Sequence, residues 1–246
     1  MAEPGPRFDG PELIGRKVAP PRPLAGRRAR WGRRIARILF VVAALPVVVI
    51  AIYRVVPPPI TPLMVIRTIE GLPINQHWVG YRDIAPNLVG AVMASEDEGF
   101  CYHDGFDVGA VREAWRAYQA TGRLRGASTI SQQTAKNLFL WPDHSFVRKA
   151  VEAYLTLLIE LLWPKQRILE VYLNIIEWGP GIYGADSAAR AYFAHPAAAL
   201  TRREAALLAA VLPNPRVWSP VHPGPYVERR TDWILPRMTS FLRGCR

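Results

Sequence analysis

An uncharged apolar run, Ile38 to Tyr53, is the part of this chain with the smallest choice of structures. A membrane-spanning helix needs about 20 apolar residues, and the run approaches that length at Val56 if Arg54 extends its guanidinium group to the interface. Trp31 and Tyr53 stand near its two ends, where aromatic residues favour the membrane–water boundary. We therefore predict one transmembrane helix over residues 38–56. A buried core helix is the alternative, which the lack of an amphipathic pattern disfavours.

Residues 1–37 precede this run and are rich in Pro, Gly and Arg. They contain ten Lys or Arg against three acidic residues, which is seven of the eleven net positive charges of the 246-residue chain. A segment with so few periodic apolar residues cannot bury a core, so we predict a disordered basic tail. Basic residues stay on the cytoplasmic side of a membrane, which predicts a cytoplasmic N-terminus and a periplasmic segment 57–246 at the bacterial inner membrane. No small residues suited to signal-peptidase cleavage follow Tyr53, so we expect the anchor to be retained.

The chain beyond residue 37 predicts neither a nucleic-acid-binding protein nor a cysteine-based metal or redox site. It has 21 basic and 17 acidic residues there and no zinc-finger or arginine-rich motif, so nucleic acid is not an expected partner. Cys101 and Cys245 are far apart, without a Cys-x-x-Cys pair or His residues at ligand spacing, so they predict neither a metal site nor a redox motif. A disulfide bond between them stays open at this point.

Helical signals recur through residues 57–246, which we expect to form one domain. Asp107 is suited to cap a helix that runs to about Gln119, and residues 201–204 form a capping box before an Ala- and Leu-rich helix to Leu212. Residues 63–66 are compatible with a short strand. There is no βαβ alternation and no Gly-rich phosphate loop, so a bound phosphate would have to be held by side chains. The predicted fold class is mostly α.

Three acidic residues, Glu96, Asp97 and Glu98, follow the apolar run 88–94. A general base that works at neutral pH needs a carboxyl pKa above the usual value of about 4.3, and the end of a buried helix supplies the necessary desolvation. Glu96 is therefore the candidate general base. A solvated helix end is the alternative, because charge clusters usually lie on the surface.

Two further stretches carry polar residues at helical spacing. In residues 126–137, Ser128 or Thr129 is suited to cap a helix with one polar face that could hold sugar hydroxyl groups and phosphate oxygens. Arg148, Lys149 and Glu152 open a second helix that is apolar almost all round, so we expect it to be central in the domain with its charges paired or lining a cavity. The alternatives are a solvated helix face and a purely structural ion pair. The polar face of the stretch 126–137 comprises Thr129, Gln133, Lys136 and Asn137.

Together these stretches resemble the biosynthetic peptidoglycan glycosyltransferases, also called family 51 glycosyltransferases, which polymerise lipid II. The resemblance covers about residues 60–220, and the segment 177–184 is similar to the monofunctional, single-domain branch of Gram-negative bacteria. Four motifs carry it: Glu-Asp-x-x-Phe-x-x-His-x-Gly at 96–105, Gly-x-Ser-Thr-Ile-x-Gln-Gln-x-x-Lys-Asn at 126–137, Arg-Lys-x-x-Glu at 148–152 and Ile-Leu-Glu-x-Tyr-Leu-Asn at 168–174.

The resemblance implies a lysozyme-like, mostly α-helical domain with a membrane-facing small lobe. It implies that Glu96 deprotonates the 4-hydroxyl group of the acceptor N-acetylglucosamine, whose oxygen attacks the anomeric carbon of the donor N-acetylmuramic acid and displaces undecaprenyl diphosphate with inversion. Lys136, Arg148 and Lys149 would hold the pyrophosphate. Glu152 would be the second carboxylate, and would orient these cations, bind a divalent ion or assist the leaving group. The positions that match residues shaping the cleft are Asp97, Phe100, His103, Ser128, Thr129, Gln133 and Asn137.

Cofactors and partners follow from the same resemblance. No cofactor is expected to be obligatory, although Mg²⁺ or Mn²⁺ could bind at the diphosphate, and His103 is expected to be structural. The expected partners are lipid II, the growing glycan strand, the membrane, and proteins of cell-wall synthesis or division. No Ser-x-x-Lys or Lys-Thr-Gly motif is present, so no transpeptidase activity is expected.

Two other functions are compatible with parts of this pattern. The first is a lytic enzyme that cleaves peptidoglycan with a Glu on a similar fold; it would have no use for the three cations, because its scissile bond carries no phosphate. The second is a membrane-tethered scaffold that binds acidic polymers through residues 1–37. Removal of that segment would abolish scaffold binding and leave polymerase chemistry intact.

Overall fold

The computed structural model describes residues 25–122, 126, 128–143, 145–241 and 245, together with residues 1 and 5. Helices predominate in this part of the chain, which confirms the mostly α fold. The chain divides into two compact units, Met1–Ala44 and Leu45–Arg246.

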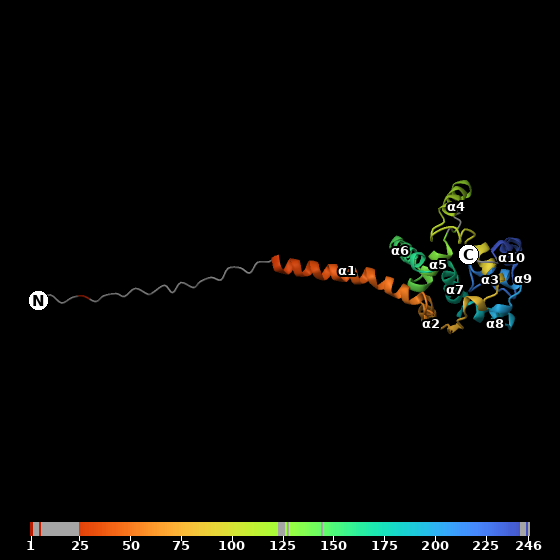
Figure 1. The fold of residues 1–246 in the computed structure, drawn as a ribbon, viewed down its shortest axis with the longest axis horizontal. Helices are drawn as coiled ribbons and strands as arrows, with labels where there is room; N and C mark the ends of the chain where they lie inside the picture. The colour runs from red at the N-terminus through yellow and green to blue at the C-terminus, as the bar shows by residue number, and fades with distance from the viewer. Residues whose placement is uncertain are drawn as a thin grey trace. The chain divides into compact units, whose positions relative to one another are not determined.

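Helix α1, Ala25–Tyr53, contains residues 38–53 of the membrane span predicted over 38–56, and residues 54–56 form a turn after the helix. Its part from Trp31 to Tyr53 is long and apolar enough to cross a membrane (Figure 1). The helix begins at Ala25 and therefore includes residues 25–37, which the sequence assigned to the tail. Arg and Ala, which are frequent there, have high helix propensity and extend the apolar helix toward the N-terminus. Residues 2–4 and 6–24 of the predicted tail lie outside the described residues.

In the second unit, one group of helices surrounds α3, Pro86–Glu96, whose side chains from Leu88 to Ala94 are all buried. Its neighbours are α9 (Arg202–Val211), α10 (Pro225–Arg237) and the short 3₁₀ segment η3 (Met238–Phe241) (Figure 1). Because α9 contributes four buried alanines, its backbone can approach α3 closely. The predicted capping box is confirmed at the start of α9. This packing buries α3 along its length and brings Glu96 to the edge of the core.

A second group is formed by α5 (Ile130–Phe139), α6 (Phe146–Leu162) and α7 (Lys165–Ile175), with α2 (Pro62–Ile69) against α5. Asp107 caps α4 (Val108–Thr121), as predicted, through a 2.8 Å hydrogen bond from the Ala110 backbone N–H. The predicted strand over residues 63–66 is wrong, since these residues belong to α2. Thr61 accepts from the Met64 N–H at 3.3 Å and Pro62 occupies the first turn, and these two helix-start signals override the apolar run.

A small three-stranded sheet and short helical elements complete the second unit. Strand β1 (Asn75–Gln76) pairs in parallel with β3 (Ile182–Tyr183), which pairs antiparallel with β2 (Glu177–Gly179). Gly181, with φ of 72°, makes the turn between β2 and β3, and a Cβ there would lie 2.3 Å from the Pro73 carbonyl oxygen. The remaining elements are η1 (Tyr81–Asp83), α8 (Ala185–Phe193) and η2 (Ala197–Ala199).

The predicted central position of α6 is wrong. Arg148 and Glu152 near its start are buried, but Phe146, Val147, Leu157 and Leu161 are exposed, with Phe146 at 94%. A helix without a polar face need not be surrounded by protein, because an apolar face also suits contact with lipid. Periodicity alone does not distinguish these two environments.

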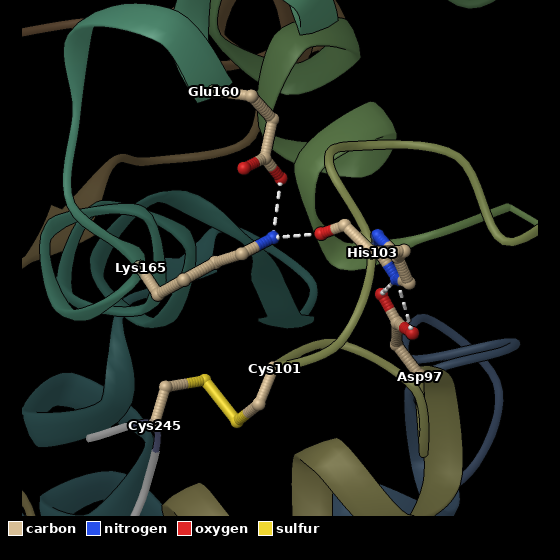
Figure 2. Close-up of a disulfide and its surroundings, with 6 residues drawn as sticks. All are labelled: Asp97, Cys101, His103, Glu160, Lys165 and Cys245. Carbon is tan, nitrogen blue, oxygen red and sulfur yellow. Dashed lines mark hydrogen bonds and ion pairs between the residues drawn. A yellow bond between two sulfur atoms is a disulfide. The ribbon is translucent and has the colours of Figure 1, made fainter.

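Cys101 and Cys245 form a disulfide bond, which the sequence left open. Their Cα atoms lie 5.2 Å apart, and the bond joins the loop after α3 to the C-terminal segment (Figure 2). Such bonds persist in oxidising compartments.

We expect the double substitution C101S/C245S to lower the free energy of unfolding by about 2–5 kcal/mol, because the bond closes a long loop in the unfolded chain. The sequence separation of 144 residues places the chain-entropy contribution near the upper end of that range. Thermal unfolding of the wild type with and without reductant, beside the double variant, measures this. Equal melting temperatures in all three samples would contradict the prediction.

Candidate active site

Helix α5 lines two adjoining cavities of about 370 and 860 Å³. Ser128, Gln133 and Lys136 contribute to both. The smaller cavity is also lined by Glu152, whereas the larger one is lined by Glu96. Of the predicted polar face, Gln133 and Lys136 line both cavities and Asn137 lines the smaller one, so these three side chains face a cleft and not a solvated helix surface.

Glu96 ends α3 and is held by residues from two other helices. The Gln133 side-chain amide donates to Glu96 Oε2 at 2.9 Å, and Tyr172 in α7 donates to Gln133 Oε1 at 3.1 Å. Arg230 in α10 lies 3.7 Å from Glu96 Oε1 and donates to the Ser95 carbonyl oxygen at 3.1 Å. These contacts fix the position of the carboxylate and leave it facing the larger cavity.

Burial raises the pKa of Glu96 above its ordinary value of 4.5, against the opposing effects of the Gln133 hydrogen bond and the Arg230 and Lys136 charges. A carboxylate with a raised pKa is a stronger base once it is ionised, which suits proton abstraction near neutral pH. The desolvation that the sequence predicted for this position is present.

If Glu96 acts as a general base, the rate of the catalysed reaction should fall as the pH is lowered through its raised pKa, because the protonated carboxyl cannot accept a proton. The acid limb of the kcat profile should therefore lie above pH 4.5. A profile measured between pH 4 and 8, with a control at each end that the protein is still folded, checks this expectation. A rate that stays constant down to pH 4.5 would contradict it.

Asp97, the residue after Glu96, ties the end of α3 to the start of α5. Its side chain accepts from the Ile130 backbone N–H at 2.9 Å and contacts His103 Nε2 at 2.9 Å (Figure 2). His103 Nδ1 accepts from the Gly105 N–H at 3.1 Å, so Nε2 carries the ring hydrogen and donates to Asp97. The contact supports the structural role expected for His103.

Lys165, at the start of α7, anchors the loop that contains His103. Its ammonium group donates to the His103 carbonyl oxygen at 2.5 Å and to Glu160 at 2.8 Å (Figure 2). It also lies 4.5 Å from the centre of the buried Phe100 ring. The loop after Glu96 is thus held by contacts with α6 and α7 and by the disulfide bond.

A cationic group lines the smaller cavity. Arg148 donates to Glu152 Oε2 at 2.6 Å, and Lys149 donates to Glu152 Oε1, so the predicted convergence of these three residues is confirmed. Arg148 Nε is buried without a hydrogen-bond partner among the described residues. Arg67 in α2 lines the same cavity. An anion in this cavity would find several donors within one wall.

Lys136 lies between this group and Glu96. Within the part of the chain that the structure describes, its ammonium group makes no ion pair or hydrogen bond. Burial lowers its pKa below the ordinary 10.5, and the nearby Arg148 and Lys149 charges act in the same direction while Glu152 opposes them. A desolvated, unpaired cation in a cavity is suited to bind a group that brings negative charge.

The predicted site residues differ in which cavity they line. Asp97 and Thr129 line a third cavity of about 380 Å³ that also includes Glu96. Phe100 and His103 line none of the cavities described here. Thr129 caps α5 and donates to the Gly105 carbonyl oxygen at 2.7 Å. The remaining predicted residues, Glu96, Glu152, Ser128, Gln133, Lys136, Asn137, Arg148 and Lys149, line the first two cavities.

Sequence reasoning missed several residues of the site. Arg67 directly follows the segment 63–66 that was predicted as a strand and carried no site signal, and Arg230 lies 134 residues beyond Glu96, where no local pattern links the two. Tyr172 lies within the fourth motif, so its position was marked although its contact with Gln133 was not. Arg67 and Arg230 could be found only from the packing of α2 and α10 around the cleft.

Two carboxylates, Asp143 and Glu152, are the acidic side chains that line the smaller cavity among the described residues. Glu152 already accepts hydrogen bonds from Arg148 and Lys149, and Asp143 is the other carboxylate that lines this cavity. No group of three or more His, Cys, Asp or Glu side chains suited to hold a metal occurs among the described residues. Hard divalent cations need several oxygen ligands.

Comparison with known proteins gives consistent matches. The family model described as "Transglycosylase" matches residues 64–239. Three relatives carry the name "Biosynthetic peptidoglycan transglycosylase". The protein of Rhodospirillum centenum is 56% identical over 212 residues, which cover 86% of this chain and 92% of the relative. Those of Caulobacter vibrioides and Pseudomonas fluorescens SBW25 are 49% and 52% identical, covering 83% and 80% of this chain and 92% and 85% of the relatives.

Proposed function

Since this chain belongs to the biosynthetic peptidoglycan transglycosylase family and is a peptidoglycan glycosyltransferase, we propose that it polymerises lipid II into linear glycan strands. The single observation that carries the proposal is the shared wall of the two cavities. It sets a desolvated base, Glu96, beside an anion-binding group that contains Lys136 and Arg148. Polymerisation from a diphosphate donor needs both groups side by side.

The proposed reaction is one in-line displacement. Glu96 takes the proton of the acceptor 4-hydroxyl group as its oxygen attacks the anomeric carbon of the donor. The bond from that carbon to the diphosphate oxygen breaks, the anomeric configuration inverts, and undecaprenyl diphosphate leaves with the electron pair. One base and a stabilised leaving group are sufficient, so no glycosyl-enzyme intermediate is required.

Lys136, Arg148 and Lys149 are the proposed partners of the diphosphate. Charge that develops on the leaving oxygen is best stabilised by fixed donors that are already desolvated, as Lys136 is. For Glu152 we propose the orienting role: its carboxylate holds Arg148 and Lys149 in the cavity wall through the two ion pairs.

Side-chain cations are proposed to neutralise the diphosphate without a protein-bound metal. The support is that Glu152 is already occupied by two cations. We therefore expect excess EDTA to change the initial rate of polymerisation less than about twofold, well below the effect of a catalytic metal. Measurement with and without EDTA, followed by Mg²⁺ or Mn²⁺ addition, checks this; a rate abolished by EDTA and restored by either ion would contradict it.

The proposed location is the bacterial inner membrane, with the N-terminus cytoplasmic and the catalytic domain periplasmic. Support comes from the apolar helix with basic residues before it, the exposed apolar face of α6, and the disulfide bond of the domain. Proteins of cell-wall synthesis or division are the proposed partners. Because these 246 residues hold no Ser-x-x-Lys or Lys-Thr-Gly motif, they are proposed to form strands without crosslinking them.

Incubation of the detergent-solubilised full chain with lipid II, with and without moenomycin, tests the proposal. Glycan polymer on a gel that disappears with moenomycin is the expected result. Shortening of preformed glycan without new polymer would support a lytic enzyme instead. Neither polymer nor shortening in a folded sample would overturn the proposal and favour a scaffold.

A further inference from the structure

The C-terminal end of α1 has a shortage of backbone donors. In a continuing helix the carbonyl groups of Tyr53, Arg54 and Val55 would accept from residues 57, 58 and 59, but these are all prolines and have no N–H. Unpaired carbonyl groups near the hydrocarbon region of a membrane cost several kcal/mol each. Donors for this helix end must therefore come from elsewhere.

Arg167 of α7 supplies such donors, and Trp163 at the end of α6 adds a hydrogen bond to Ile50, whose carbonyl oxygen already accepts from the Arg54 backbone N–H. Arg167 donates from Nε and Nη2 to the Tyr53 carbonyl oxygen at 3.1 and 2.8 Å, and from Nη2 to that of Val56 at 2.9 Å. Trp163 Nε1 donates to the Ile50 carbonyl oxygen at 2.7 Å. We call Trp163 and Arg167 the anchor clamp.

The anchor clamp is itself held in place. Glu170 accepts from Arg167 and also from the Tyr81 backbone N–H at 3.2 Å. The Arg167 guanidinium carbon lies 5.5 Å from the centre of the Trp78 ring. Ile50 is fully buried although most of α1 is exposed, so this end of the helix belongs to the domain core. Because its side chains have these fixed partners, the anchor clamp can hold the end of α1 in a defined position relative to α7.

Helix α7 connects the clamp with the catalytic base. Arg167 and Tyr172 are five residues apart on it, about 7.5 Å along the helix axis. Tyr172 donates to Gln133, which donates to Glu96. At its start, Lys165 holds the loop after Glu96 through the His103 carbonyl oxygen. One rigid element thus contacts both the end of the membrane anchor and the network that fixes the base.

We propose that Trp163 and Arg167 are positioning residues that fix the cleft at a set distance from the membrane surface. This inference rests on the proposed function, in which the donor is a diphosphate whose lipid tail stays in the bilayer. The height of the diphosphate above the hydrocarbon region is then given by the membrane, and the height of Glu96 by the anchor clamp. An error of about 1 Å in such an alignment can cost two orders of magnitude in rate.

The test compares two substrates with the full-length protein. One is undecaprenyl lipid II in liposomes, and the other is a short-chain lipid II analogue in dilute detergent, which no bilayer positions. We expect R167Q and W163F to lower the liposome rate at least about tenfold and the rate on the soluble analogue less than about twofold. W163F keeps an aromatic ring but removes the N–H donor together with part of the indole volume, so R167Q is the cleaner of the two variants. R203Q, which removes an ion pair with Glu228 on the surface, is the matched control and should leave both rates unchanged.

Equal losses on both substrates would overturn the proposal, since they would indicate damage to the catalytic network itself. No loss on either substrate would also overturn it. Hydrogen–deuterium exchange in nanodiscs gives a readout that does not depend on polymerisation: the amides of residues 50–56 should exchange faster in R167Q than in the wild type and R203Q. Unchanged exchange would refute the clamp. If the wild type polymerised neither lipid, the proposed function would fail, and exchange would still decide whether the clamp exists.

Discussion

Replacement of Glu96 by Gln should lower lipid II polymerisation by about 10²- to 10⁴-fold, the usual contribution of a positioned general base. The amide is nearly the same size and can still accept from Gln133, so the hydrogen-bond network around the position is retained. Only the proton acceptor is lost. Initial rates with lipid II, measured beside circular dichroism and thermal unfolding, separate this loss from unfolding.

Stability provides a second readout for the same variant. The folded-state pKa of Glu96 is raised, so folding favours the protonated carboxyl, and this contribution is lost as the pH rises through the folded pKa. At pH 7 the ionised carboxylate therefore costs free energy that a neutral amide does not. We expect E96Q to melt at or above the wild-type temperature while being inactive.

Glu98 offers a matched control, because it is two residues away and its side chain is 56% exposed. E98Q should retain polymerisation within about a factor of two, as expected for a largely exposed charge that lines only the third cavity and neither of the two cavities that hold the proposed reacting groups. Near wild-type turnover in E96Q, or equal losses in both variants, would refute the assignment of the base.

Replacement of Lys136 by Met should lower polymerisation by about 10²- to 10³-fold, the usual cost of removing one fixed donor from a developing negative charge. Lys136 lies between the base and the Arg148–Glu152 pair, and its ammonium group is desolvated and unpaired in the described part of the chain. Methionine preserves the aliphatic length without the charge. The reduced rate should appear mainly in kcat if the charge acts on the leaving group.

Two further variants make this prediction specific. K136R keeps a cation and should recover part of the rate, although its planar guanidinium group does not reproduce a point charge. R203Q removes a surface cation and should retain full activity. If K136M and R203Q both kept more than half of the wild-type kcat, stabilisation of the leaving group by Lys136 would be excluded.

Local patterns anticipated much of the fold and the nature of the site. The caps at Asp107 and Thr201 predicted helix starts because capping depends on three or four consecutive residues. The Arg148–Glu152 pair was predictable because residues four apart on a helix are neighbours. The apolar run at 88–94 correctly indicated that the next carboxylate would be desolvated.

Other expectations failed where the environment of an element decided the outcome. The strand expected at 63–66 is helical because Thr61 and Pro62 start a helix, and the apolar residues are compatible with either structure. The expected central position of α6 is wrong because an apolar surface can face core or lipid with the same sequence. In both cases the apolar character of the segment was predicted correctly, but the structure or surroundings of that segment were not.

By itself the sequence determined the apolar anchor, the helices that carry the motifs, and the residue types of a base and a group of cations. Only the tertiary structure decided that Arg230 contacts Glu96 and Tyr172 contacts Gln133, that Cys101 bonds to Cys245, and that Arg167 caps the end of α1. The physical reason is the range of the interactions. Caps and neighbours on a helix are set by a few consecutive residues, whereas these contacts join segments 39 to 144 residues apart and exist only once the helices have packed.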